Sequence, residues 1–126
     1  MKHFKLRKDL KIYSFGTTLY RIEAIKDGPW GPAGVLGGYI ERKSNLSDNA
    51  WVFRDAKIYG NARIYGNAQV YGNALMFDNA HAFDNAFISG NARVCGAARI
   101  CNNALVSGSA YISGNIQVSG NTIIDE

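Results

Sequence analysis

The chain has 126 residues, 47% of them apolar and 19% charged, with a formal net charge of +4; this suits one globular domain and argues against a multidomain enzyme. No apolar run reaches the roughly 18 residues of a membrane span, and no signal-peptide core follows the start, so we expect a cytoplasmic protein without membrane contact. Two cysteines and two histidines are too few for a structural zinc site or a disulfide framework, so we predict no metal and no cofactor.

Residues 1–35 predict a cap. Strand-like runs at 12–15 and 19–25 surround a turn at 16–18, which indicates a β-hairpin, and a loop rich in glycine and proline follows at 27–34. A hairpin here would cover the exposed first edge of the structure that follows. This segment holds seven basic and three acidic residues and so carries the whole charge excess. The alternative is a nucleic-acid-binding arm, whose basic residues would be Lys5, Arg7, Lys8 and Lys11.

A six-residue period governs the rest of the chain. From residue 48 to residue 125 the sequence forms thirteen hexads without an insertion, among them GNARIY, GNAQVY and GNALMF. Alanine fills the third position in eleven hexads, and valine or isoleucine fills the fifth position in eleven. Leu46 and Ile40 fall on the same fifth position, so two degenerate hexads extend the repeat back to residue 36.

Each hexad predicts one short strand and one corner. In the run 62–65 side chains alternate with a period of two, so the alanine and isoleucine face inward and the arginine and tyrosine outward. The following Gly66 and Asn67 tolerate a left-handed backbone and turn the chain. A hairpin meander would not need the same small and branched residues at fixed sites. Stacked parallel strands do need them, and predict internal columns of Ala and of Val or Ile with ladders of corner Asn.

This repeat resembles the hexapeptide-repeat proteins, in which a small residue follows an aliphatic one after four positions. Their fold, with three hexads per triangular coil, implies five coils for residues 36–125. We therefore expect an all-β protein, a left-handed parallel β-helix of about five triangular coils over 36–126, with an N-terminal β-hairpin cap and loop over 1–35. The runs TLYRIEAIKDG and GVLGGYIERKSNLSDNAWV are also similar to a group of largely uncharacterised bacterial and prophage proteins with this cap.

The last coil predicts an open edge. Ile116 and Thr122 replace the usual alanine there. Either the two terminal acids blunt this edge or another chain covers it by oligomerisation.

Outward residues eighteen apart stack on one of three faces. Face three carries no charge before Asp125, and its aromatic patch is larger than a soluble monomer usually exposes. We predict self-association through it, as the homotrimer that the resemblance implies. The alternative is that the rings only stack along the strands. The predicted interface residues are Trp51, Phe53, Tyr71, Phe87 and Leu105.

Face two stacks three cationic or titratable side chains beside two aromatic rings. Guanidinium groups bind phosphate bidentately, and neighbouring rings can stack on a base, so this face is the first ligand-binding candidate, for a phosphate-bearing small molecule. The alternative is that the arginines are solvated and the tyrosine packs along their stems. The residues are Arg63, Tyr65, His81, Phe83 and Arg99.

His81 is also a weak catalytic candidate, because the hexapeptide acyltransferases use a histidine base near a cleft between subunits. In those enzymes extended loops shape the substrate site, whereas no loop interrupts these hexads. Asp78 and Asp84 occupy corners, so neither is placed to orient His81. The three zinc-binding histidines that γ-class carbonic anhydrases need are not present. Cys95 and Cys101 lie outward on adjacent faces of one coil and are expected to diverge as free thiols.

Three functions stay open at this point. The uninterrupted repeat favours a non-enzymatic oligomeric β-helix, a binding or scaffold protein that holds a protein partner through its aromatic face or a phosphate-bearing ligand through face two. A coenzyme A-dependent acyltransferase rests on fold analogy. A prophage factor that inhibits host defence by binding a nucleotide signal or a nucleoprotein rests on the resemblance and the basic cap, and nucleic-acid binding of this kind would depend on salt.

Overall fold

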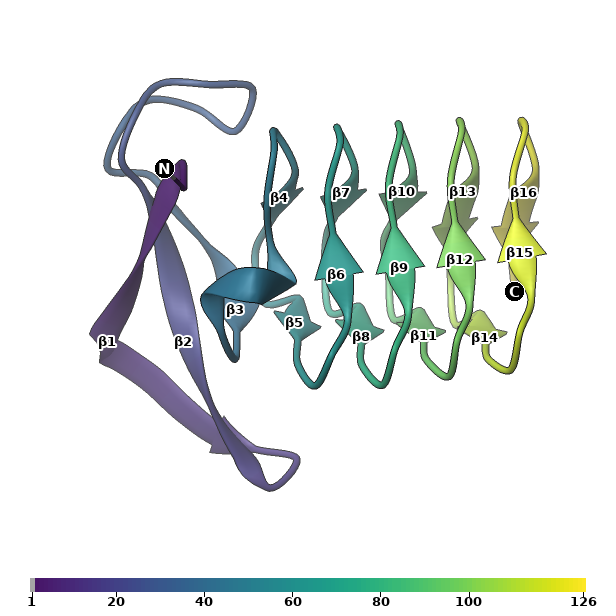
Figure 1. Ribbon diagram of the computed structural model, residues 1–126, viewed down its shortest axis with the longest axis horizontal. Coiled ribbons are helices and arrows are strands. Elements are labelled where there is room, and N and C mark those ends of the chain that lie inside the picture. The colour runs from purple at the N-terminus through teal and green to yellow at the C-terminus, as the bar shows by residue number, and fades with distance from the viewer. Residues whose placement is uncertain (1) are drawn as a thin grey trace.

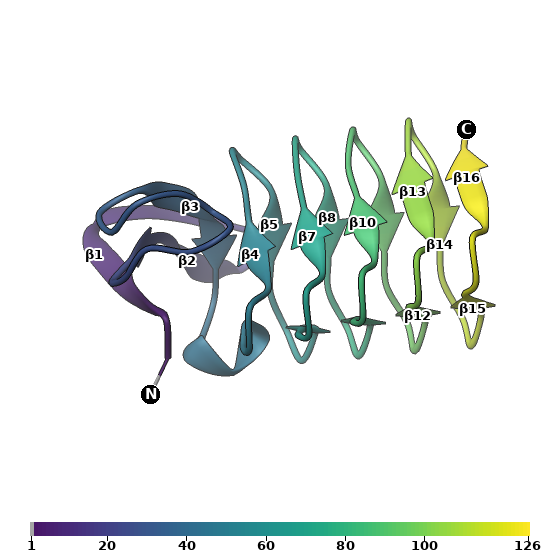
Figure 2. The ribbon, with the colours of Figure 1, turned by 90° about the horizontal axis from the view of Figure 1, so that it is seen from above.

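The computed structural model describes residues 2–126, which form an all-β solenoid of about five turns behind an N-terminal hairpin. Figure 1 shows the turns as a row of stacked rungs with the hairpin at one end, and Figure 2 shows the same row from above. Within these residues the one helical element is η1 (Lys43–Asn45), a single 3-10 turn.

No helix in the described part of the chain is long and apolar enough to cross a membrane.

The hairpin consists of β1 (Phe4–Ser14) and β2 (Thr17–Ala24), which pair antiparallel. The sequence predicts the hairpin, but it places the start of the first strand too late, because the regular alternation is interrupted by a register shift between Arg7 and Lys11. Both turn residues, Phe15 and Gly16, have positive φ values of 55° and 75°, as tight two-residue hairpin turns require.

The strands of the solenoid form three sheets, one for each predicted face, and each residue pairs in parallel with the residue eighteen positions later. Face one contains β3 (Leu36–Ile40), β5 (Lys57–Ile58), β8 (Leu75–Met76), β11 (Arg93–Val94) and β14 (Tyr111–Ile112). Face two contains β6 (Arg63–Ile64), β9 (His81–Ala82), β12 (Arg99–Ile100) and β15 (Gln117–Val118). Face three contains β4 (Trp51–Val52), β7 (Gln69–Val70), β10 (Phe87–Ile88), β13 (Leu105–Ser107) and β16 (Ile123–Asp125).

The core is a stack of similar layers, one for each rung. The third-position alanines and the fifth-position aliphatic residues are buried along the solenoid up to Ile112 and Val118. Burial of each Val or Ile side chain removes apolar surface worth about 1.5–3 kcal/mol from water. The packing confirms the predicted internal columns. In the last turn Ile116 and Ile123 are exposed, in line with the open edge that the replaced alanines predict.

The corners depend on a left-handed residue directly after each outward side chain that follows a strand. Glycine takes this position at most corners, whereas Asp48, Arg54, Asp78, Asp84 and Asn102 adopt it with φ between 56° and 59°. The Asp and Asn side chains accept the backbone N–H of the residue one rung further on; the Asp78 carboxylate, for example, accepts from Gly96 at 3.0 Å. The predicted ladders of corner Asn are present as one side-chain hydrogen bond within residues 2–126, from Asn85 to Asn103, while backbone bonds join the other corners.

The hairpin continues face one and closes the first rung. β2 pairs antiparallel with β3, and Leu19 and Ile22 of β2 are fully buried. Gly38 takes the place of the usual alanine, because a Cβ there would come within 2.6 Å of the Ala56 carbonyl oxygen. The loop after β2 lays Trp30 over Trp51 of face three.

Candidate functional site

Side chains at the sixth hexad position, directly after the inward aliphatic residue, form three columns, which we name edges. The first edge lies between faces one and two and contains Glu41, Tyr59, Phe77, Cys95 and Ser113. The second edge lies between faces two and three and contains Ser47, Tyr65, Phe83, Cys101 and Ser119. The third edge lies between faces three and one and contains Phe53, Tyr71, Ser89 and Ser107.

The face-two cluster comes together as the sequence predicts. Arg63 pairs with His81 and His81 pairs with Arg99 on adjacent strands, so the three side chains stand in one column. On the second edge beside them, Tyr65 stacks on Phe83 with ring centroids 5.1 Å apart. The Arg99 guanidinium lies 5.2 Å from the centroid of the Phe83 ring, a distance that permits a cation–π contact.

His81 lies between two positive charges. Burial lowers its pKa, and the charges of Arg99 and Arg63 lower it further. Its Nδ1 atom lies 3.3 Å from the Tyr65 hydroxyl, the one side-chain hydrogen-bond partner that it has among the described residues. A general base needs a group that orients it and holds its charged form, usually a carboxylate. The surroundings of His81 instead favour a neutral ring and an incoming anion.

A hollow of about 390 Å³ opens beside this cluster at the second edge. Its lining contains Arg63, Tyr65 and His81, together with Ser47 and Asp48 from the rung that precedes them. Oδ2 of Asp48 accepts the backbone N–H of Gly66 at 2.9 Å, which fixes the carboxylate at the rim. The hollow therefore combines a cation, an aromatic ring and a fixed acceptor.

A second hollow, also of about 390 Å³, adjoins the first, since Ser47 and Asp48 line both. It is further lined by Lys2, His3 and Lys26. The Lys2 ammonium donates to the Leu46 carbonyl at 2.9 Å, which holds this charge close to the first rung. The two hollows together carry more basic than acidic side chains.

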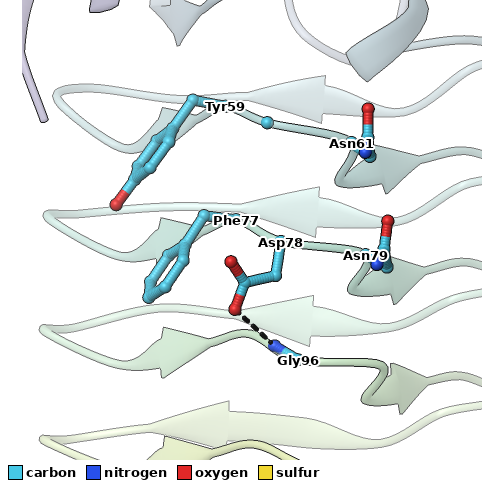
Figure 3. Close-up of a pocket in the computed structure, with 7 residues that line it drawn as sticks. Tyr59, Asn61, Phe77, Asp78, Asn79 and Gly96 are labelled. Carbon is cyan, nitrogen blue, oxygen red and sulfur yellow. Dashed lines mark hydrogen bonds between the residues drawn. The ribbon is translucent and has the colours of Figure 1, made fainter. Parts of the chain in front are cut away.

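A third hollow, of about 450 Å³, lies on the first edge and is shown in Figure 3. Tyr59 and Phe77 lie parallel there with centroids 5.1 Å apart, and Asp78 points its carboxylate toward the Gly96 backbone. Burial raises the pKa of Tyr59, and the neighbouring Asp78 raises it further, so its hydroxyl stays protonated. Among the residues that line this hollow Asp78 is the one charged side chain, and it is already engaged. The hollow offers no acid–base pair.

Face three differs from the prediction at one residue. Trp51 is 2% exposed, because Trp30 and His3 of the cap cover its ring at centroid distances of 5.1 and 5.7 Å. It is therefore not available at a surface, and the predicted interface loses this residue. Phe53, Tyr71 and Phe87 are partly exposed and stack in sequence at 4.0 and 4.8 Å, and Leu105 lies on the next rung. Self-association through them stays a prediction.

The basic cap is partly neutralised. All four predicted residues lie on β1, but Arg7 donates to both Asp9 and Glu23, and Lys5 lies 3.6 Å from Glu23. Hydrogen bonds from Arg7 lower the pKa of each of these carboxyls, so both stay charged near neutral pH. Lys8 and Lys11 stay exposed.

Cys95 and Cys101 are free thiols, as the sequence predicts, but they are not exposed. Each lies on an edge, one rung after an aromatic ring, and contacts a polar side chain on the next rung. The Cys95 sulfur lies 3.6 Å from the Tyr111 hydroxyl, and the Cys101 sulfur lies 3.9 Å from the Gln117 amide. These contacts cover the outward side chains and keep them from solvent.

Residues 2–126 contain no group of three or more His, Cys, Asp or Glu side chains arranged to hold a metal ion. The side chains that the sequence did not single out are Ser47, Asp48, Lys2 and Lys26. Ser47 can be recognised from the sequence, because it stands at the hexad position that carries an aromatic ring in the next six hexads. The lysines carry no such signal, because they lie outside the repeat.

The family model described as YdcK Beta solenoid repeat matches residues 56–69, 86–99 and 98–114. All three stretches lie inside the repeat, and they agree with a β-solenoid. No curated protein matches the chain significantly in sequence.

Proposed function

We propose that this β-solenoid is a non-enzymatic binding protein that holds a phosphate-bearing ligand at the face-two cluster. The observation that supports this most directly is the register that sets His81 between Arg63 and Arg99 on three successive strands. None of the salt bridges among residues 2–126 involves either arginine. Two guanidinium groups without a salt-bridge partner on one rigid sheet attract an anion, and each can donate two N–H groups to it.

His81 should make the affinity for the phosphate-bearing ligand depend on pH. A bound anion offsets the repulsion from Arg63 and Arg99, so binding raises the pKa of His81, which is lowered in the free protein. Protonated His81 then supplies a third positive charge. We expect tighter binding as the pH falls from about 8 to 6. Sulfate is a suitable probe because its charge does not change in this range, and H81Q should abolish the pH dependence.

The direct test is calorimetric titration of the full chain with ribose 5-phosphate. Replacement of both arginines, R63Q together with R99Q, should weaken binding at least about tenfold, because charge-assisted hydrogen bonds to the phosphate are lost. R93Q is the matched control, since Arg93 occupies the same hexad position on face one and is likewise exposed on its strand. A wild-type chain that binds no ribose 5-phosphate, or an equal loss in R93Q, would contradict the proposal.

The proposal also covers the handedness and the self-association of the solenoid. We propose that the solenoid winds left-handed, as in the hexapeptide-repeat proteins that its hexads resemble, and that it self-associates through Phe53, Tyr71, Phe87 and Leu105 on face three. The partial exposure of this uncharged column supports the second point. An acyltransferase would need His81 as a base, and its contact with Tyr65 and two arginines supports anion binding better.

A further inference from the structure

On each edge, the column of aromatic rings begins at the ring nearest the cap. This first ring has no preceding ring of its own column to stack on. On the first edge that ring is Tyr59, and Phe15 from the hairpin turn covers it, with ring centroids 4.8 Å apart and planes 6° from parallel. On the third edge it is Phe53, which packs against the core cluster and stays partly exposed. The cap therefore supplies a covering ring to the first edge.

The second edge lacks such a cover. Its first ring is Tyr65, which stacks on Phe83 on one side. On the other side the opposing position of the preceding rung is Ser47, as the pairing of Leu46 with Ile64 shows. A hydroxymethyl group stands where a ring would continue the column, and the hollow of about 390 Å³ lies at this place.

The hollow has the dimensions and the chemistry of a slot for a flat ring. Successive rings on the other edges lie 4.0 to 5.1 Å apart, which is the spacing of adjacent strands, so one planar group fits over Tyr65 in register. Figure 3 shows this arrangement for Tyr59 and Phe77 on the first edge, where both rings lean toward the following rung. Tyr65 has the same lean, since its hydroxyl reaches His81 on the next strand.

The polar side chains around the slot indicate which polar groups a bound ring has. Arg63 lines it on the side of face two, next to His81. Asp48 accepts one backbone N–H with Oδ2, and its other oxygen has no hydrogen-bond partner among residues 2–126. Because Asp48 lines the hollow, that oxygen can accept an N–H from the edge of a bound ring. Lys2 and Lys26 in the adjoining hollow add positive potential.

We infer that the slot over Tyr65 binds the base of a nucleotide, whose phosphate lies against Arg63. This rests on the proposed phosphate binding at face two and names the class of ligand: a base with an N–H donor for Asp48, stacked on Tyr65 in the place that Phe15 occupies over Tyr59. Base–aromatic stacking is a strong, sequence-tolerant contribution to nucleotide affinity.

Calorimetric titration with GMP and with ribose 5-phosphate separates the two claims. GMP should bind at least about tenfold more tightly, because the base adds one stacking contact and one hydrogen bond. Y65L keeps an apolar side chain on Phe83 but removes the flat ring, and should abolish this difference. Y59L is the matched control, since the Tyr59 ring stacks on Phe77 at the same 5.1 Å but is already covered by Phe15. It should leave the GMP affinity unchanged.

A second variant fills the slot from within. S47F supplies the missing ring, and should abolish the advantage of GMP while ribose 5-phosphate still binds and the circular dichroism spectrum is unchanged. Equal affinity of the wild-type chain for GMP and ribose 5-phosphate would overturn the base slot and leave the phosphate site standing. Equal losses in Y59L and Y65L would also overturn it. Binding of neither compound would overturn both proposals.

Discussion

A left-handed corner residue sets the geometry of each rung, and the side chain at this position decides whether the next rung gains a hydrogen bond. Where the residue is Asp78 or Asn102, its side chain accepts the backbone N–H eighteen positions later. Where it is Gly60, the corresponding N–H of Asp78 has no partner among the described residues. Each glycine corner thus lacks one hydrogen bond to the next rung, and in return its backbone is unstrained.

Gly60 therefore allows a test of this trade. Gly60 has a φ of 64°, and a Cβ there would meet the Asp78 nitrogen at 3.3 Å, a contact that small shifts relieve. G60A should lower the free energy of unfolding by about 1–2 kcal/mol, the usual cost of a left-handed alanine. G60N tolerates this backbone and adds an acceptor for the Asp78 N–H, so it should stay within about 1 kcal/mol of the wild type. Urea denaturation measures both, and equal losses in the two variants would contradict this account.

His3 makes the cap sensitive to acid. It is buried between Trp30 and Trp51, and its Nε2–H donates to the Ala50 carbonyl at 2.8 Å. Burial lowers its pKa; the hydrogen bond to Ala50 and the charge of Asp48 oppose this effect, whereas Lys26 and Lys2 lower it further. The folded protein thus binds this proton less readily than the unfolded chain, whose histidine titrates near pH 6.5.

The contribution of His3 to the free energy of unfolding should therefore be fully present above about pH 6.5. It should be lost as the pH falls below this value toward the lowered pKa of the folded state. H3Q keeps an N–H donor for Ala50 but does not titrate, and should flatten the curve of unfolding free energy against pH. H81Q is the control for the second histidine, whose pKa is also lowered. If H3Q leaves the slope between about pH 7 and 5 unchanged, His3 is not its source.

At the scale of the element, hexad spacing determines the strands, and the sequence therefore predicts them. One inward aliphatic residue per six leaves room for a two-residue strand and a corner, and this agrees with the ranges of β5, β6 and β7. The same spacing places Arg63, His81 and Arg99 in one column, because residues eighteen apart pair in parallel. A periodic sequence contains this information locally.

The cap could be predicted only in part, because its contacts join residues that are distant in sequence and follow no period. The turn predicted at 16–18 indicates a hairpin, and the structure places it one residue earlier, at Phe15 and Gly16. Nothing local indicates that Phe15 covers Tyr59 or that Trp30 covers Trp51. The buried state of Trp51 and the hollow at Ser47 both depend on these contacts. The cap thus determines which outward residues are available for binding.

At the scale of the whole molecule, the rigid rungs hold two different surfaces apart, the cationic cluster on face two and the uncharged column on face three. Phe87, Leu105 and Ile123 follow one another on adjacent strands of face three, and Ile123 is 69% exposed. A flat apolar column of this kind can be covered by a second copy of the chain, since a two-fold symmetric contact pairs the same surface of both copies.

L105E tests the proposed self-association. A carboxylate between Phe87 and Ile123 would lose hydration on association, so the dissociation constant should rise at least about tenfold, since each 1.4 kcal/mol of desolvation corresponds to one factor of ten. L75E is the matched control: Leu75 holds the same hexad position on face one, between Lys57 and Arg93, where a negative charge is compatible with its neighbours. Sedimentation velocity of the three proteins at equal concentration measures the outcome. A wild-type chain that sediments as a monomer at tens of micromolar, or a dissociation constant that L75E raises as much as L105E does, would remove face three as the contact surface and leave the binding cluster on face two to act in a single chain.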